Sequence, residues 1–491
     1  MHFWGCCAYR WLARSQWTKN LLSIGILFAL FAIKFSTPAL ASEGAHLDGS
    51  RLSLLWALPF VGMLLSIALF PLLASRFWEH HFGKVAAFWA ATLLLPCAAK
   101  FGFLTTATEV AHTAALEYFP FIILLFSLFV VAGGIRLVGN LAGNPATNTA
   151  ILGIGTIAAS LVGTTGASML LIRPLIIANQ HRHHNAHVFV FFIFLVANIG
   201  GSLTPLGDPP LFLGFLKGVD FLWTVTAMFP PMALASIILL ALFYLIDRYH
   251  WRNEGAKKPA SHALRRMKIE GLHNVVYLLG IVVAVLFSGI WKSDISLPLG
   301  FGIEVPLEGL IRDLVLLLLG YLSWRTTRKT IRIENAFTWT PIQEVGFLFA
   351  AIFVTIIPVL AILRAGKDGA LAPLLSLVTA SDGRPIDAAY FWLAGGLSSF
   401  LDNAPTYLVF FNLAGGDAQT LMGPLFKTLL AISAGAVFMG ANTYIGNAPN
   451  FMVKSICEER GIRMPGFFGY MAWSGGILLP LFALLTLVFF R

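Results

Sequence analysis

Charged residues are scarce in this sequence of 491 residues. Asp, Glu, Lys and Arg together make up 11% of it, whereas roughly a quarter is usual in soluble domains. The stretches without charge recur as runs of about 20 apolar residues, the length that an α-helix needs to cross a bilayer. The scarcity of charge excludes a large soluble domain, and the runs predict an all-α polytopic membrane protein.

Cysteine is also rare, with four residues in the whole chain. Cys6 and Cys7 lie near the start, while Cys97 and Cys457 are isolated, so their spacing indicates neither a disulfide framework nor a metal site. The formal net charge is +10, but the basic residues gather between apolar runs, as membrane topology requires. We therefore expect no nucleic-acid partner, no bound cofactor and no catalytic metal.

The first 41 residues resemble a secretory signal. Arg14 and Lys19 precede an apolar run, and the small residues of TPALAS suit cleavage after Ala41. The alternative is an uncleaved first helix. With cleavage, the mature N-terminus would be periplasmic in a multi-pass protein of a bacterial inner membrane.

Ten spans and two re-entrant hairpins are expected along the chain. The predicted spans are 52–75, 85–104, 118–138, 186–216, 221–246, 272–290, 309–324, 341–363, 421–455 and 466–490. The hairpins, 149–180 and 388–414, are broken near their middles by GTTGAS (163–168) and LDNAPT (401–406). Such turns are tolerated at membrane depth where they are buried in protein or line a cavity.

The charge pattern fits this topology. If neither hairpin crosses the membrane, one side receives the basic loops, which are 76–84, 181–187, 247–271, 325–332 and 454–463. That excess marks the cytoplasmic side.

An internal repeat relates the two halves of the chain. Adding 239 to the numbering of GSLTPLGDPPLF (201–212) reaches GANTYIGNAPNF (440–451), and five of the twelve residues match. The same offset aligns the two hairpin turns. We therefore predict two inverted repeats, 52–246 and 272–490, joined by a cytoplasmic basic loop at 247–271.

Both matched motifs contain residues that interrupt helices. These are Gly200, Gly201, Pro205, Pro209 and Pro210 in the first motif and Gly440, Gly446 and Pro449 in the second. Paired broken helices are typical of secondary transporters, whose binding site forms near the midplane. The alternative is that Gly and Pro are common in membrane helices, which fits one motif better than two.

Two carboxylates within the membrane, Asp208 and Asp402, indicate the cargo. Such groups are costly there and are usually functional, and they would bind transported Na⁺ or H⁺. Oxygen ligands that suit a hard cation accompany them: Thr164, Thr165, Ser168, Thr204, Asn403, Thr406, Asn442, Thr443 and Asn447. For any single Thr or Asn, the alternative is a hydrogen bond between helices. Arg173, in the first hairpin, would meet an anionic substrate or, as we prefer, reach the cytoplasmic edge.

Four stretches carry a family resemblance. They are ANIGGSLTPLGDPP (197–210), SSFLDNAPTYLVFFN (398–412), GANTYIGNAPN (440–450) and ENAFTWTPIQEVGFLFAAIF (334–353). They resemble sodium/proton antiporters of the NhaD type, and even more the related citrate transporters of the ion transporter superfamily. The resemblance implies site roles for the Asp208 and Asp402 motifs, and adds Glu344 as an accessory carboxylate.

Alternatives to antiport stay open at this point. Citrate and dicarboxylate carriers of the superfamily typically show Ser-Asn-Thr at both hairpin turns, where this chain has Gly-Thr-Thr and Asp-Asn-Ala. We therefore place sodium/proton antiport ahead of organic-anion symport. An intramembrane aspartyl protease is disfavoured because neither aspartate has the expected neighbours, so we expect no enzyme. A channel and a homodimer are compatible with the sequence.

Overall fold

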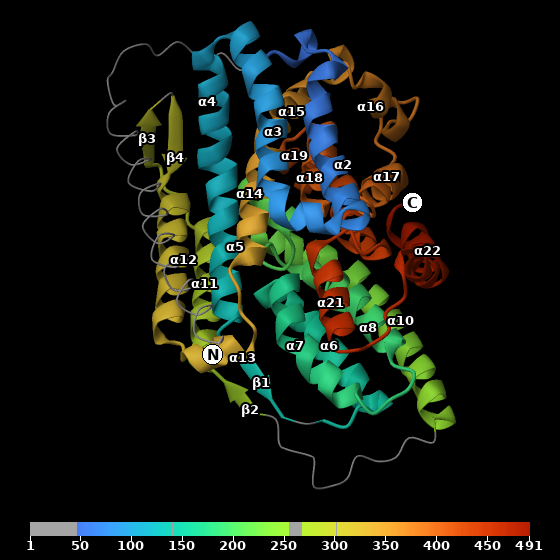
Figure 1. The fold of residues 1–491 in the computed structure, drawn as a ribbon. Helices are drawn as coiled ribbons and strands as arrows, with labels where there is room; N and C mark the ends of the chain where they lie inside the picture. Colours follow the sequence, from blue (N-terminus) through green and yellow to red (C-terminus); the bar gives the residue numbers. More distant parts are fainter. Residues whose placement is uncertain (1–46, 140, 255–267, 301) are drawn as a thin grey trace.

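The structure is a computed structural model that describes residues 47–491 apart from 140, 255–267 and 301 (Figure 1). The predicted signal, 1–41, lies outside the described residues. Within the described residues, nine helical segments are long and apolar enough to cross a membrane. They are Leu54–Pro71, Ser75–Phe101, Phe103–Ala132, Pro145–Val162, Ala186–Leu203, Phe221–Asn253, His273–Ile290, Thr340–Arg364 and Phe467–Phe489. The chain is an all-α polytopic membrane protein, as the composition predicts.

The first half contains helices and one short strand. In order they are η1 (Gly49–Arg51), η2 (Leu54–Ala57), α2 (Leu58–Leu73), α3 (Ser75–Phe101), α4 (Phe103–Thr113), η3 (Ala114–Tyr118, a π-helix), α5 (Phe119–Ala132), β1 (Arg136–Val138), α6 (Pro145–Val162), α7 (Thr164–Asn179), α8 (Ala186–Leu195), η4 (Ile199–Leu203), α9 (Pro209–Leu216) and α10 (Phe221–Asn253).

The second half follows a related order. Its elements are β2 (Lys268–Glu270), α11 (His273–Ile290), β3 (Ser296–Gly300), β4 (Ile303–Pro306), α12 (Leu307–Thr326), α13 (Lys329–Glu334), α14 (Thr340–Thr355), α15 (Ile357–Arg364), η6 (Gly366–Asp368), α16 (Ala372–Val378), α17 (Asp387–Ser398), α18 (Asn403–Leu413), α19 (Ala418–Met422), α20 (Phe426–Phe438), η7 (Met439–Asn442), α21 (Ala448–Glu459) and α22 (Phe467–Phe489). β1 pairs with β2, and β3 pairs with β4, both in antiparallel orientation.

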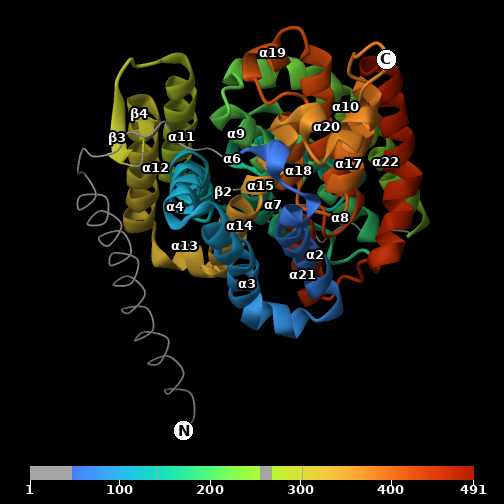
Figure 2. The ribbon, with the colours of Figure 1, turned by 90° about the horizontal axis from the view of Figure 1, so that it is seen from above.

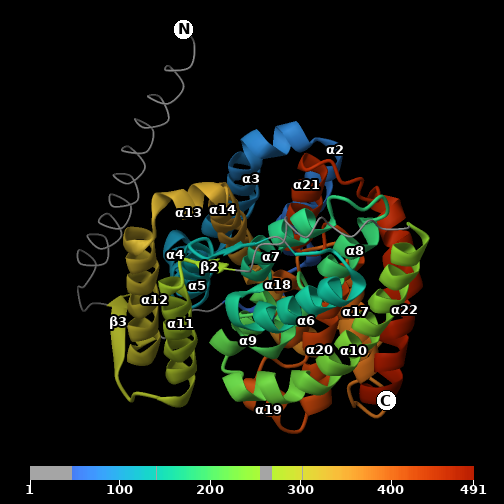
Figure 3. The same ribbon diagram turned by 90° about the horizontal axis from the view of Figure 1, so that it is seen from below.

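The helices that carry the breaks form the centre of the molecule. Views from the two ends place α11 and α12 at one side and α22 at the other, with α18 between them (Figures 2 and 3). Every residue of α18 is buried, as is all of α8 except its first residue. Non-helical backbone at membrane depth is tolerated only where it is buried in protein or lines a cavity. The interrupted segments are therefore enclosed by protein, where freed backbone groups can find partners.

Several predicted boundaries are wrong. The predicted loop at 76–84 lies in α3, which begins at Ser75, and the helical segment that contains most of the third predicted span begins at Phe103 rather than 118. The predicted loop at 454–463 is helical to Glu459. Lys, Arg and Glu are good helix formers, so charged stretches continue these helices beyond their apolar runs instead of ending them.

Two predicted spans, 309–324 and 421–455, are not among the nine described helical segments that are long and apolar enough to cross a membrane. Within 309–324, α12 carries Arg312 and Asp313, and within 421–455 the apolar helix is short, covering Phe426–Asn442. Conversely, α6 by itself is long and apolar enough to cross a membrane, although the sequence predicts it as the first arm of a re-entrant hairpin.

Candidate ion-binding site

The first helix break is a tight crossing of the chain on itself. A Cβ atom added at Gly207 would lie 2.0 Å from the carbonyl oxygen of Gly201, so only glycine fits. The Thr204 hydroxyl donates to the carbonyl oxygen of Ser160 in α6 (2.5 Å) and accepts from the Leu206 amide (3.1 Å). The break is therefore a fixed feature, held by α6.

The second break repeats these contacts at the same offset. The Thr443 hydroxyl donates to the carbonyl oxygen of Ser399 (2.5 Å) and accepts from the Ile445 amide (3.2 Å). The numbering differs by 239 for both partners, since 443 − 204 = 399 − 160. A Cβ atom at Gly446 would lie 2.6 Å from the oxygen of Gly440, as at the first crossing.

The two hairpin turns also correspond. Gly163, with φ of +78°, separates α6 from α7, a backbone conformation that glycine adopts readily. Asp402 caps α18 by accepting a hydrogen bond from the Ala404 amide (3.1 Å), and its carbonyl oxygen accepts from the Thr406 hydroxyl (3.0 Å). Each turn is followed directly by a helix N-terminus, that of α7 after Gly163 and that of α18 after Asp402.

All four motifs meet at Asp208, whose exposed fraction is 1%. Its carboxylate accepts hydrogen bonds from Thr164 of the first hairpin (3.1 Å) and Asn403 of the second (2.5 Å). The Asn447 amide of the second break donates to it over 3.3 Å. No basic side chain contacts Asp208 among the described residues.

These four residues form two pairs related by the offset. Thr164 corresponds to Asn403, and Asp208 corresponds to Asn447. The hydrogen bonds between them bring the two halves together at one point, with a single carboxylate where the repeat partner is neutral. The site is therefore near-symmetric in shape and asymmetric in charge.

Four helix N-termini also point to this cluster. α7, α9, α18 and α21 begin at Thr164, Pro209, Asn403 and Ala448, each next to or within a site motif. The unpaired amides at a helix start carry partial positive charge, which favours negative charge nearby. The arrangement therefore favours negative charge at the cluster, whether from Asp208 or from a carboxylate ligand.

Two predicted site residues carry buried oxygens without hydrogen-bond partners among the described residues. They are the Ser168 hydroxyl and the Asn442 side-chain oxygen. Buried polar atoms normally have a partner, so these oxygens are available to a ligand. The Asn442 amide nitrogen donates to the Ser399 hydroxyl (2.9 Å).

Other predicted residues lie outside the cluster. Glu344, in α14, accepts a hydrogen bond from the Trp78 indole (2.8 Å), and no hydrogen bond joins it to the described residues of the four motifs. Thr165 is half-buried. Pro209, Pro210 and Pro449 occupy the first turns of α9 and α21, where proline suits a helix start.

Sequence reasoning missed four polar residues that hold the site. Ser160 and Ser399, on the first arms of the hairpins, bind the breaks through both hydroxyl and carbonyl groups. Asn198 donates to Asn450 (2.7 Å), which joins the two breaks directly. The offset of 239 also relates Ser160 to Ser399, so the repeat was a signal that could have found them.

The Gly207 crossing gives a testable prediction. Gly207→Ala is expected to lower the unfolding temperature, because the added methyl group overlaps backbone, and overpacking costs about 1–3 kcal/mol. Gly475→Ala is the matched control, since nothing lies within 4 Å of a Cβ atom there. Thermal unfolding of purified protein in detergent measures both, and equal melting of the two variants would contradict the crossing.

Comparisons with known proteins separate the two resemblances. No curated protein matches the chain. One family model matches residues 49–490, nearly the whole chain, and it supports the citrate transporters and not the NhaD antiporters specifically. The chain is thus a secondary transporter, and it belongs to the family described as "Putative citrate transport".

Proposed function

We propose that this transporter exchanges Na⁺ for H⁺ at the Asp208 carboxylate. The observation that supports this most is the environment of Asp208: it is buried, it contacts both hairpins and the second break, and its partners are neutral. An anionic group without a basic partner is a place for a cation. Na⁺ and H⁺ would compete for the same oxygens, which by itself couples their movements in opposite directions.

Oxygen ligands for a hard cation surround this carboxylate. The unpartnered oxygens of Ser168 and Asn442 are available, and the Asn403 and Asn447 amides can present oxygen instead of nitrogen after a side-chain flip. Asp402 adds a second carboxylate at the residue before Asn403. Protonation of Asp208 would remove the charge that holds Na⁺ there.

Alternating access would come from the two repeats. We propose that 52–246 and 272–490 lie inverted in the membrane, with hairpins that re-enter from opposite sides. The hydrogen bonds that recur at an offset of 239 support this arrangement. A bacterial inner membrane, and assembly as a homodimer, belong to the same proposal.

A second candidate is cation-coupled symport of citrate or a dicarboxylate. The family description favours it, and so do the four helix N-termini, which are suited to a carboxylate ligand. In that case Asp208 would hold the coupling cation and the anion would bind beside it.

One assay separates the two candidates. Inverted vesicles containing the protein are acidified, and a fluorescent pH probe reports proton release when Na⁺, Li⁺, K⁺ or citrate is added. Antiport predicts that Na⁺ added without citrate restores the signal of the pH probe, and that labelled citrate is not taken up. Saturable citrate uptake that requires Na⁺ would replace antiport with symport, and absence of both activities would contradict the proposed cation site.

A further inference from the structure

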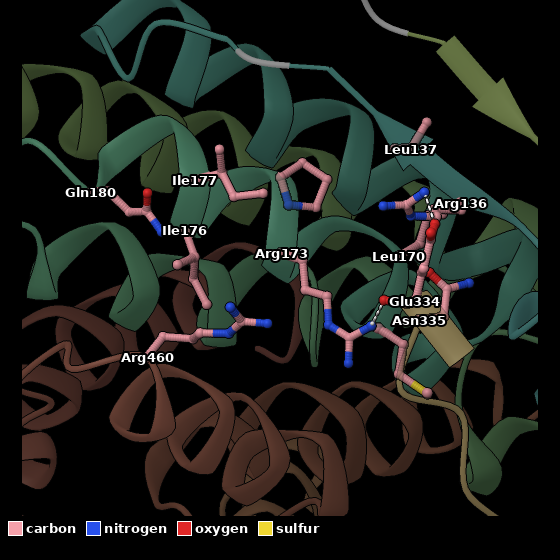
Figure 4. Close-up of a pocket in the computed structure, with 12 residues that line it drawn as sticks. Arg136, Leu137, Leu170, Arg173, Ile176, Ile177, Gln180, Glu334, Asn335 and Arg460 are labelled. Atoms are coloured by element: carbon pink, nitrogen blue, oxygen red, sulfur yellow. Dashed lines mark hydrogen bonds and ion pairs between the residues drawn. The ribbon is translucent and has the colours of Figure 1, made fainter. Parts of the chain in front are cut away.

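A second candidate binding site lies away from Asp208, between β1, α13 and the ends of α7 and α21. Here a cavity of about 140 Å³ is lined by three arginines, Arg136, Arg173 and Arg460 (Figure 4). That volume is several times what one water molecule needs. The arginines come from three separate elements, so the fold rather than local sequence assembles them.

The three guanidinium groups differ in their partners. Arg136 forms ion pairs with Glu270 (3.1 Å) and Glu334. Arg173 donates to the main-chain oxygen of Glu334 (3.1 Å) but has no carboxylate partner among the described residues. Figure 4 shows Arg173 between Arg460 on one side and the Arg136–Glu334 pair on the other.

Arg460 is the least compensated of the three. It is exposed, and within the described part of the chain it forms no ion pair and no hydrogen bond through its side chain. Glu459, its neighbour in the sequence, is also exposed and forms no ion pair there with either Arg173 or Arg460. No carboxylate of the described residues pairs with either cation, although Glu459 acts on Arg173 through its charge and Glu334, paired with Arg136, lines the cavity. Arg460 and Arg136 repel Arg173, and this repulsion falls when an anion enters.

We propose that this cavity binds a phosphate-type oxyanion, either as the head group of an anionic phospholipid or as free phosphate. Guanidinium groups match such oxygens in pairs of parallel hydrogen bonds. The remaining wall is largely apolar and includes Leu170, Ile176 and Ile177, of which Ile177 is 45% exposed. Such a wall suits the glycerol and acyl part of a lipid, and basic pockets on the cytoplasmic side are suited to lipid head groups.

The position of the cavity connects it to the transport elements. α7 begins at Thr164 and α21 begins directly after Asn447, both of which contact Asp208. Arg173 lies about 14 Å along α7 from Thr164, at 1.5 Å per residue. A bound oxyanion would therefore link the far ends of two site helices to β1 and α13, whatever the cargo is.

Ligand-dependent thermal unfolding of the full-length protein in detergent tests this site. Short-chain phosphatidylglycerol is compared with phosphatidylcholine, and inorganic phosphate with chloride at equal ionic strength. We expect phosphatidylglycerol, phosphate or both to raise the unfolding temperature of the wild type by about 2–4 °C. R173Q/R460Q is expected to lose the rise, whereas R325Q/R328Q, two exposed arginines outside the cavity, keeps it.

The comparison between the lipid and the phosphate additions identifies the source of the oxyanion. A rise with phosphatidylglycerol alone assigns the site to a lipid head group, and a rise with phosphate assigns it to the free anion. Arg460→Gln alone serves as a second variant, because this side chain forms no hydrogen bond whose loss could unfold the protein, and it is expected to at least halve the rise. No rise in the wild type, or a full rise in R173Q/R460Q, overturns the proposal.

Discussion

Asp208→Asn is expected to reduce Na⁺-driven proton release from inverted vesicles to the level of empty vesicles. The substitution keeps the size of the side chain but removes its charge and its exchangeable proton. An asparagine oxygen can still accept from Thr164, whereas the nitrogen would face the Asn403 amide, which donates to the carboxylate over 2.5 Å. A neutral group there binds neither H⁺ nor a strongly held Na⁺, so coupling is lost.

The repeat supplies a sharp companion experiment. Asn447 occupies the position equivalent to Asp208 and donates to it over 3.3 Å. D208N/N447D therefore restores one carboxylate to the cluster with a small displacement. We expect this double variant to recover part of the exchange that Asp208→Asn removes, and Na⁺-induced proton release by protein in detergent provides a second readout without transport.

Two other carboxylates serve as comparisons. Asp402→Asn is expected to impair exchange while α18 stays capped, because asparagine caps helix starts as well as aspartate does. Glu344→Gln is expected to keep exchange, since Glu344 binds Trp78 instead of the cluster. Full activity of Asp208→Asn, with normal protein levels, would remove Asp208 from the mechanism.

The sequence predicts the centre of this molecule better than its margins. The breaks near Thr204 and Thr443 were predicted because proline, paired glycines and polar residues oppose a continuous helix. The structure interrupts both helices there and ends the first hairpin arm at Gly163, as the turn motif predicts. These features depend on local residue types, which a single sequence displays directly.

Features that depend on partners far along the chain were predicted less well. Nothing local distinguishes Ser160 from other serines, and its role depends on the break that packs against it. Asp247 was assigned to the basic loop at 247–271, whereas it is fully buried in α10, which continues to Asn253. Hydropathy treats such a charge as solvated, because it does not show the partner that compensates it.

Asp247→Asn is expected to destabilise the folded protein by about 3 kcal/mol, because it leaves the buried Arg182 with only its longer ion pair, to Glu254 over 3.4 Å. Asp247 forms an ion pair with Arg182, and both side chains are 0% exposed. His187 and Asn148 also contact this carboxylate, over 2.8 and 3.0 Å. The group joins the first hairpin and the start of α8 to the end of α10, so its loss loosens the end of the first repeat.

The exposed pair of Arg384 and Asp382 provides the control. Its side chains are 86% and 57% exposed, and exposed pairs contribute about 0–1 kcal/mol, so Asp382→Asn should melt close to the wild type. R182Q/D247N removes both charges and is expected to recover part of the stability, because the buried arginine is gone and Glu254, its second partner, still accepts from the His184 amide (2.7 Å). Unfolding temperatures in detergent measure all four proteins. If Asp247→Asn melts with Asp382→Asn, the Asp247 carboxylate does not stabilise this end of the molecule, and the link between the hairpin and α10 must come from the Arg182–Glu254 pair and apolar packing.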